Sequence, residues 1–164
     1  MRLIQDGMLD KTICDTLIQT YQNNRKLCAL WHDTNTLNLA KVESEHDQLA
    51  KKVIFGITSY LNTKGGVVYP ELAQVVHRQK GSIHNLHLDQ ARTTTVMTSI
   101  TYLNDDYEGG ETFFEDGLFV KPKIGRSLFF DGLSYKHGVN ACGGDRFVLA
   151  IWYTNDINNF YGIN

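Results

Sequence analysis

Two histidines and an aspartate lie close together in HNLHLDQARTTTVMTSITYL, residues 84–103, just before a run of β-branched residues. In a β-strand, residues i and i+2 point to the same face, so His87 and Asp89 are expected side by side. An imidazole nitrogen and a carboxylate oxygen can share a divalent cation, but two ligands alone hold a metal poorly. His84 would point to the opposite face of this strand and is not expected to be a ligand.

The third ligand is expected from a separate segment. His137, in SYKHGVN, lies far downstream on a short β-like run beside a Gly-rich turn. In an antiparallel sandwich, such a strand can return beside the earlier one. Two histidines and one carboxylate on one face of an octahedron are typical of non-haem Fe(II) oxygenases. We therefore predict a metal site formed by His87, Asp89 and His137.

An arginine begins the last β-like run, RFVLAIWY. Alternation places Arg146 on one strand face with Val148, Ala150 and Trp152, and Phe147, Leu149, Ile151 and Tyr153 on the other. A guanidinium on an apolar strand is costly unless it meets an anion, and its planar fork suits a carboxylate. Tyr102 is a candidate to donate a hydrogen bond to that carboxylate, and Trp152 is either core or pocket wall.

The elements that position these side chains fall into two groups. Apolar residues at helical spacing predict one helix over 10–24, with Asp10 as N-cap, and another over 44–66, with Ser44 as its cap. From residue 67 onward, short β-like runs bounded by Gly, Asn, Asp or Pro follow one another. This order predicts an α+β domain in which helices cover an antiparallel sandwich or barrel.

Two further stretches are expected to lack regular structure. Residues 31–46 form a polar, irregular segment, which is either a lid over the site or an ordinary surface loop. The Asn-rich residues 155–164 are expected to be a tail.

Length and composition exclude several classes of protein. The 164 residues carry a net charge of −2, so no nucleic-acid partner is expected. No apolar run approaches the length of a membrane span, and no signal peptide is expected at the start. Three cysteines do not form a disulfide framework. We therefore expect a cytoplasmic protein that binds no membrane.

Several motifs together carry a resemblance to a known family. The HxD motif is followed by YLND at 102–105, GGETFF at 109–114, KPKIGRSLFF at 121–130 and HGVNACGGDR. In order and spacing they resemble the 2-oxoglutarate/Fe(II) dioxygenases, and among these the prolyl 4-hydroxylase-like branch. The resemblance covers about residues 67–155. It implies a double-stranded β-helix, a jelly-roll relative of the cupins, with N-terminal helices packed on one sheet.

The resemblance also implies a domain organisation and a role for each site residue. A single domain over 1–164 would have 1–66 as helical support and 67–155 as jelly-roll core. His87, Asp89 and His137 would bind Fe(II). Arg146 would pair with the distal carboxylate of 2-oxoglutarate, and Tyr102 and Trp152 would complete that pocket.

The implied reaction hydroxylates a C–H bond, with succinate and CO2 as co-products and ascorbate as a supporting cofactor. The expected acceptor is a prolyl residue of a peptide or protein. Two alternatives stay open: an oxygenase acting on a free amino acid or small metabolite, and a non-catalytic cupin-like module that holds a metal or anion. Regiochemistry and oligomeric state stay open too.

One departure from the family pattern concerns the co-substrate. Many prolyl hydroxylase relatives carry a tyrosine nine or ten residues before the HxD histidine. Here those positions are Arg78 and His77. Either the near end of the co-substrate is held differently in this chain, or the substrate side has changed.

Overall fold

The computed structural model describes residues 1–42 and 46–160, so the cap expected at Ser44 lies outside the described residues. Its helical elements are α1 (Lys11–Asn23), α2 (His46–Asn62) and the short 3-10 turns η1 (Arg25–Leu27), η2 (Leu39–Lys41) and η3 (Ile157–Asn159). Its strands are β1 (Arg2–Gln5), β2 (Ala29–Trp31), β3 (Thr34–Asn38), β4 (Tyr69–Arg78), β5 (His84–His87), β6 (Thr95–Tyr102), β7 (Thr112–Phe114), β8 (Phe119–Val120), β9 (Ser127–Phe130), β10 (His137–Val139) and β11 (Arg146–Thr154).

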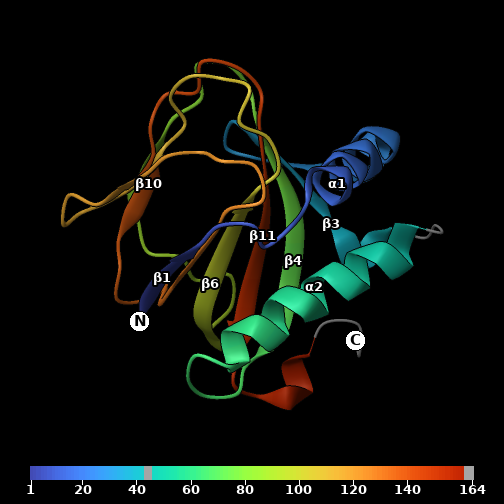
Figure 1. Ribbon diagram of the computed structural model, residues 1–164, viewed down its shortest axis with the longest axis vertical. Coiled ribbons are helices and arrows are strands. Elements are labelled where there is room, and N and C mark those ends of the chain that lie inside the picture. The colour runs from blue at the N-terminus through green and yellow to red at the C-terminus, as the bar shows by residue number, and fades with distance from the viewer. Residues whose placement is uncertain (43–45, 161–164) are drawn as a thin grey trace.

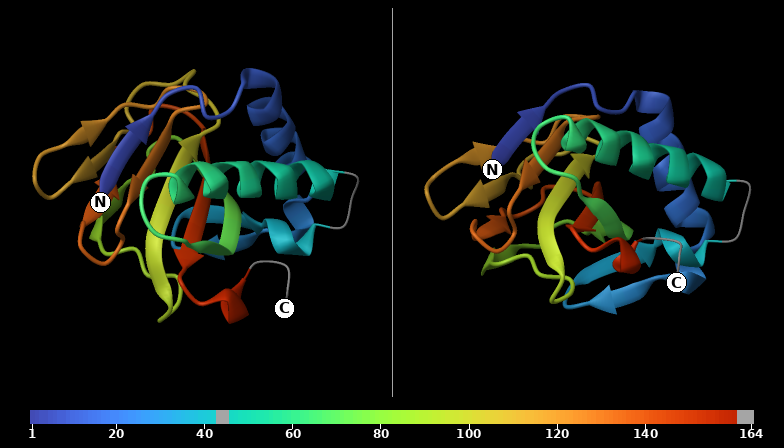
Figure 2. Two further views of the ribbon diagram at one scale, coloured as in Figure 1. Left: turned by 60° about the horizontal axis from the view of Figure 1, so that its bottom comes forward. Right: turned by 90° about the horizontal axis from the view of Figure 1, so that it is seen from below.

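The strands form two antiparallel sheets. Within the described residues the larger sheet has seven strands in the order β1-β9-β6-β11-β4-β3-β2, and the smaller has four in the order β5-β10-β7-β8. Figures 1 and 2 show both helices on the face of the large sheet that is turned away from β10. This is the predicted α+β jelly roll, with helices packed on one sheet.

Strand β11 has one face in the core under the helices and its other face on a cavity between the two sheets. It pairs with β4 on one side and with β6 on the other. As predicted, its side chains alternate: Phe147, Leu149, Ile151 and Tyr153 join the core under the helices, whereas Arg146, Val148, Ala150 and Trp152 line a cavity between the sheets. The period of two along a strand therefore sends one set to the core and the other to a candidate site.

The helices complete the core on the other face of the large sheet. The Asp10 carboxylate accepts a hydrogen bond from the Ile13 backbone N–H at 2.8 Å, which is the predicted N-cap of α1. One face of each helix is buried against the strands, with Leu17 and Tyr21 from α1 and Ile54, Ile57 and Leu61 from α2. Both helices therefore pack on one face of the large sheet, and the cavity lies on its other face.

The polar segment expected to be a loop instead contains a strand. Residues Thr34 to Asn38 form β3, which pairs along β4 from Thr34 opposite Arg78 to Asn38 opposite Gln74. Because β1, β2 and β3 all join the large sheet, the expected division into helical support over 1–66 and jelly-roll core over 67–155 needs correction. Asn35 and Asn38 disfavour a strand here, but the edge of β4 supplies backbone partners for the whole segment.

The C-terminal stretch is also more ordered than expected, as far as residue 160. After η3, the Phe160 ring stacks on Phe55 of α2 at 5.5 Å and meets the edge of Tyr69 at 6.2 Å. The remaining four residues, 161–164, lie outside the described residues.

Cys14, Cys28 and Cys142 are all free thiols. None of the helices in the described ranges is long and apolar enough to cross a membrane.

Replacing a core leucine of β11 tests the two-sided role of this strand. Leu149 is fully buried, so we expect Leu149→Ala to lower the free energy of unfolding by about 2–5 kcal/mol. The matched control is Leu30→Ala, at a side chain that is 71% exposed, with an expected loss below about 0.5 kcal/mol. Urea denaturation measures both, and equal losses would contradict this packing.

Candidate active site

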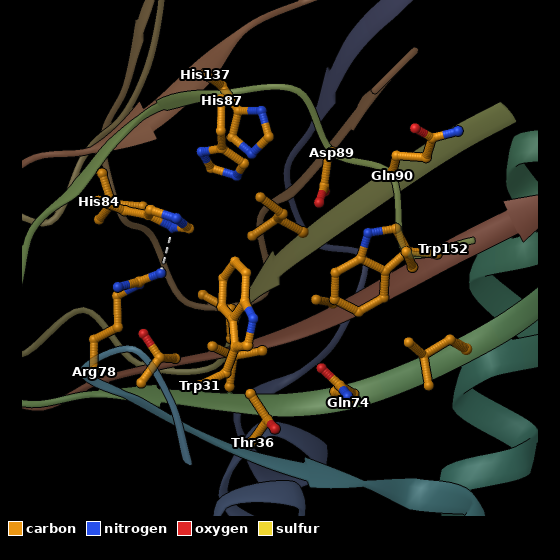
Figure 3. Close-up of a pocket in the computed structure, with 18 of the residues that line it drawn as sticks. Trp31, Thr36, Gln74, Arg78, His84, His87, Asp89, Gln90, His137 and Trp152 are labelled. Atoms are coloured by element: carbon orange, nitrogen blue, oxygen red, sulfur yellow. Dashed lines mark hydrogen bonds between the residues drawn. The ribbon is translucent and has the colours of Figure 1, made fainter. Parts of the chain in front are cut away.

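A cavity of about 500 Å³ lies between the two sheets. Five of the six predicted site residues line it: His87, Asp89, His137, Arg146 and Trp152. Figure 3 shows both imidazoles, the Asp89 carboxylate and the Trp152 indole on the border of this one space. Strand pairing therefore brings together side chains from β5, β10 and β11 that are far apart in the sequence.

His87 and His137 face each other across the β5–β10 pair. They are register partners, and their ring centroids lie 4.4 Å apart. The Nδ1–H of His87 donates to the Asn85 carbonyl oxygen at 2.9 Å. This hydrogen bond selects the tautomer in which Nε2 keeps its lone pair, which is the form that binds a metal.

His137 is the more deeply buried of the two imidazoles. It is 3% exposed and packs against the Phe130 ring at a centroid distance of 4.5 Å. Burial, helped by the neighbouring His87, lowers the pKa of His137 to about 3, although the Tyr135 backbone opposes the shift. The ring is therefore neutral at physiological pH, as a metal ligand must be, and its buried Nδ1 has no hydrogen-bond partner.

Asp89 follows β5 and is held through its backbone. Its N–H donates to the Gly132 carbonyl oxygen at 2.9 Å, and a Cβ at position 132 would lie 2.3 Å from the Asp89 carbonyl oxygen, so this approach requires glycine. Burial raises the pKa of Asp89, while Trp152, His87 and Thr98 act in the opposite direction. A cation beside this carboxylate would favour its charged form.

These side chains fit Fe(II) by donor type, although they do not yet surround one point. No three His, Cys, Asp or Glu side chains in residues 1–42 and 46–160 stand in metal-binding geometry. His87 nevertheless offers a free Nε2, His137 is neutral, and Asp89 makes no ion pair within these ranges. The predicted ligand set of His87, Asp89 and His137 stays a prediction that this arrangement supports.

His84 corrects one expectation about orientation. It does not point away from His87, because the two rings stack with centroids 3.9 Å apart. The pairing of β10 with β5 shifts register between His137 and Val139, so a bulge turns His84 back to the cavity face. The Nη2–H of Arg78 donates to Nδ1 of His84 at 2.6 Å, as the dashed line in Figure 3 marks.

Arg146 is 1% exposed and lines the same cavity. Its Nε–H donates to the Gly110 carbonyl oxygen at 3.0 Å, and Nη2 donates to Thr112 Oγ1 at 3.3 Å. Gly110 has a φ of +65°, and a Cβ there would lie 2.8 Å from the Tyr107 ring. Within the described residues Arg146 pairs with no carboxylate and its Nη1 makes no hydrogen bond, so it is available to an anion.

Tyr102 lies behind this arginine and does not line the cavity. Its hydroxyl lies 2.7 Å from Thr112 Oγ1 and donates to the Val120 carbonyl oxygen at 3.1 Å. The Arg146 guanidinium lies 5.2 Å from the centre of the Tyr102 ring. Tyr102 is thus placed to act on Arg146 through Thr112, and its direct contact with the co-substrate stays a prediction.

Trp152 forms a wall of the cavity and was the least specific of the expected site residues. Its indole Nε1–H is buried without a hydrogen-bond partner, and the indole beside Asp89 opposes part of the rise that burial causes in the pKa of that carboxyl. An indole that leaves its donor free beside a carboxylate can orient that carboxylate when the site is loaded.

Sequence reasoning gave no role to Arg78, although the signal was present. Strand β4 alternates like β11, and Leu72, Gln74, Val76 and Arg78 all line the cavity. His77 points to the helices instead: its Nε2 lies 2.8 Å from Asp145 Oδ1, and its Nδ1 lies 3.1 Å from the Tyr21 hydroxyl. Applying the two-residue period to β4 would have separated His77 from Arg78.

Comparison with known proteins identifies the family of this chain. Residues 71–154 match the 2OG-Fe(II) oxygenase superfamily. Prolyl 3-hydroxylase 2 of Rattus norvegicus is 26% identical over 94% of this chain, which spans 26% of the length of that relative.

Solved structures agree on the fold. The viral collagen prolyl hydroxylase from Paramecium Bursaria Chlorella virus-1, in its 2OG complex, has a TM-score of 0.73 at 23% identity over 94% of this chain and 96% of that one. A Trichoplax adhaerens prolyl hydroxylase, in complex with a hypoxia inducible factor peptide fragment, has a TM-score of 0.80 at 15% identity over 94% and 83%. The predicted double-stranded β-helix is confirmed.

The chain therefore belongs to the 2OG-Fe(II) oxygenase superfamily. The family as a whole uses Fe(II) and 2-oxoglutarate, and the donor set described above is compatible with both.

Removing one candidate ligand tests the metal site. We expect His137→Ala to weaken Mn(II) binding at least about 100-fold, because an imidazole that contacts the ion is lost. The control is His32→Ala, at an exposed turn outside this cavity, with unchanged affinity expected. Isothermal titration with Mn(II) measures both, and wild-type affinity in His137→Ala would remove His137 from the ligand set.

Two isosteric variants test how Tyr102 acts. If its hydroxyl works through Thr112, Tyr102→Phe and Thr112→Val should each weaken 2-oxoglutarate binding by a similar factor, about two- to tenfold. Direct contact with the co-substrate instead predicts a clearly larger loss for Tyr102→Phe than for Thr112→Val. Titration of Mn(II)-loaded protein with 2-oxoglutarate measures both, with thermal unfolding as the control for folding.

Proposed function

We propose that this protein is an Fe(II)- and 2-oxoglutarate-dependent hydroxylase of prolyl residues in a peptide or protein. The observation that carries the proposal is the meeting, in one cavity, of His87, Asp89 and His137 with a buried arginine that has no carboxylate partner in the described residues. A metal-binding edge and an anion-binding end are what an oxygenase with a dicarboxylate co-substrate needs.

The chain's own residues have distinct tasks in this reaction. His87, Asp89 and His137 would hold the metal, and Arg146 would orient the co-substrate by its distal carboxylate. When bound, Fe(II) supplies the chemistry by which oxygen hydroxylates the substrate while 2-oxoglutarate becomes succinate and CO2. Apolar walls from Ile100, Val139 and Val148 would keep bulk water away from the reacting groups.

The opening of the cavity supports a peptide as the acceptor. Leu30 and Trp31 of β2 and Leu88 after β5 line the cavity, and all three remain exposed, Trp31 to 53%. Exposed apolar side chains grouped at a cavity mark a surface that binds something. A prolyl ring is apolar and its flanking peptide backbone is polar, which suits a mouth where apolar side chains adjoin polar residues such as Gln74 and Gln90.

Proline as the acceptor rests on the relatives. The relative described above is a prolyl 3-hydroxylase, whereas the motifs of this sequence resemble those of the prolyl 4-hydroxylase-like branch, so product analysis must decide the hydroxylated carbon. We also propose that ascorbate sustains turnover and that the protein works in the cytoplasm, where its three free thiols would stay reduced.

The direct experiment is a coupled assay with Fe(II), 2-oxoglutarate, ascorbate and proline-rich peptides. We expect peptide-dependent succinate formation and a mass gain of one oxygen on proline.

Arg146→Gln should raise KM for 2-oxoglutarate about 10- to 100-fold, because the charge-assisted contact is lost. Arg92→Gln, at an exposed arginine outside the cavity, is the matched control.

Each contrary result has a separate meaning. Succinate formation that no peptide stimulates would reject prolyl hydroxylation and favour a free amino acid or small metabolite. Absence of any turnover, together with the absence of a visible band from Fe(II) and 2-oxoglutarate without oxygen, would leave a binding module instead of an enzyme.

A further inference from the structure

A second buried arginine faces the same cavity. Arg78 is 4% exposed and stands directly opposite Arg146 in the pairing of β4 with β11. Both residues line the cavity, so their side chains lie on the same face of the sheet. Like charges at directly opposed positions of a sheet destabilise it unless something compensates.

Protein groups compensate this charge only in part. Arg78 Nη1 lies 3.4 Å from Asp33 Oδ1, a half-exposed carboxylate on the β2–β3 turn, and 3.3 Å from Ser82 Oγ. Arg146 has no carboxylate partner within the described ranges. Burial and the neighbouring Arg146 lower the pKa of Arg78 to about 10, so the Arg78 guanidinium stays charged at neutral pH. The cavity therefore carries positive charge that an anionic ligand would neutralise.

The second arginine makes hydrogen bonds to different partners from those of the first. Arg146 is held by Gly110 and Thr112, whereas Nη2 of Arg78 donates to Nδ1 of His84, whose ring stacks on His87. Figure 3 shows Arg78 and His84 on the same side of the cavity, with His87 beyond them. Arg78 thus reaches toward the predicted metal ligands.

The contact with Arg78 also decides what His84 can do. An arginine only donates hydrogen bonds, so Nδ1 of His84 must accept, and the neutral ring then carries its proton on Nε2. A nitrogen that carries a proton cannot ligate a metal. His84 therefore offers an N–H donor beside His87.

We propose that Arg78, together with the Nε2–H of His84, forms a second carboxylate-binding corner that takes the keto-acid end of the co-substrate. Arg146 takes the other end, so a dicarboxylate lies between two guanidinium groups. The inference rests on the proposed function and deepens it, since it identifies the residues that replace the tyrosine carried near this position by many relatives.

Three probe ligands separate the two ends of the co-substrate. 2-Oxoglutarate has both carboxylates, 4-oxopentanoate lacks the one at the keto-acid end, and 2-oxobutanoate lacks the distal one. Binding of each to Mn(II)-loaded protein without Fe(II) turnover is measured by calorimetry. We expect Arg78→Gln to weaken 2-oxoglutarate and 2-oxobutanoate about tenfold or more and to leave 4-oxopentanoate within about twofold.

Matched variants make the pattern specific. Arg146→Gln should show the complementary pattern, with losses for 2-oxoglutarate and 4-oxopentanoate but not for 2-oxobutanoate. Arg92→Gln should change none. If Arg78→Gln fails to fold, Arg78→Lys keeps the charge, and His84→Phe keeps a stacking ring without the N–H. Both should still lose affinity selectively for the two ligands with a keto-acid carboxylate.

The results that overturn the inference differ from those that overturn the proposed function. If Arg78→Gln lost affinity equally for all three ligands, or lost none, Arg78 would not bind the carboxylate at the keto-acid end. Failure of the wild-type protein to bind 2-oxoglutarate at all would reject the oxygenase assignment itself, and this inference with it.

Discussion

The register between β4 and β11 is the constraint on which the rest of the structure depends. Because side chains alternate along a strand, a slip of one residue would exchange the core face of β11 for its cavity face. The slip would remove Phe147, Leu149 and Ile151 from the core under the helices. It would also turn Arg146 into that core without a partner. The hydrophobic core thus holds the arginines where an anion can reach them.

The cavity combines two regions of opposite electrostatic character. Asp89 lies beside the imidazoles of His87 and His137 at one edge, where a cation would pair with the carboxylate, and two guanidinium groups lie on the opposite sheet, where an anion would pair with them. A metal together with an anionic co-substrate balances both regions at once. Buried charges are tolerated when a partner of opposite charge is available. Here a metal cation would be the partner of the carboxylate, and an anionic co-substrate would be the partner of the guanidinium groups. These are the charges of the ligands that the family uses.

Much of the fold followed from local pattern. The strands after residue 67, both helices and the Asp10 cap were predictable because each depends on periodicity or on a hydrogen bond within a few residues. β3 was not, because the asparagines of TNTLN mask the strand preference of its threonines, and its backbone partners come from β4 far along the chain. The bulge that turns His84 toward His87 was also out of reach, since it arises from how β5 pairs with β10.

The sequence by itself determined the types of group available: two imidazoles, a carboxylate and an arginine, in an order and spacing that indicated the family. Only the tertiary structure decided which of these share a cavity, that Tyr102 reaches the site through Thr112, and that Arg78 joins it while His77 does not. The physical reason is that chemical type belongs to a residue, whereas direction and distance arise from strand pairing between segments far apart in the chain.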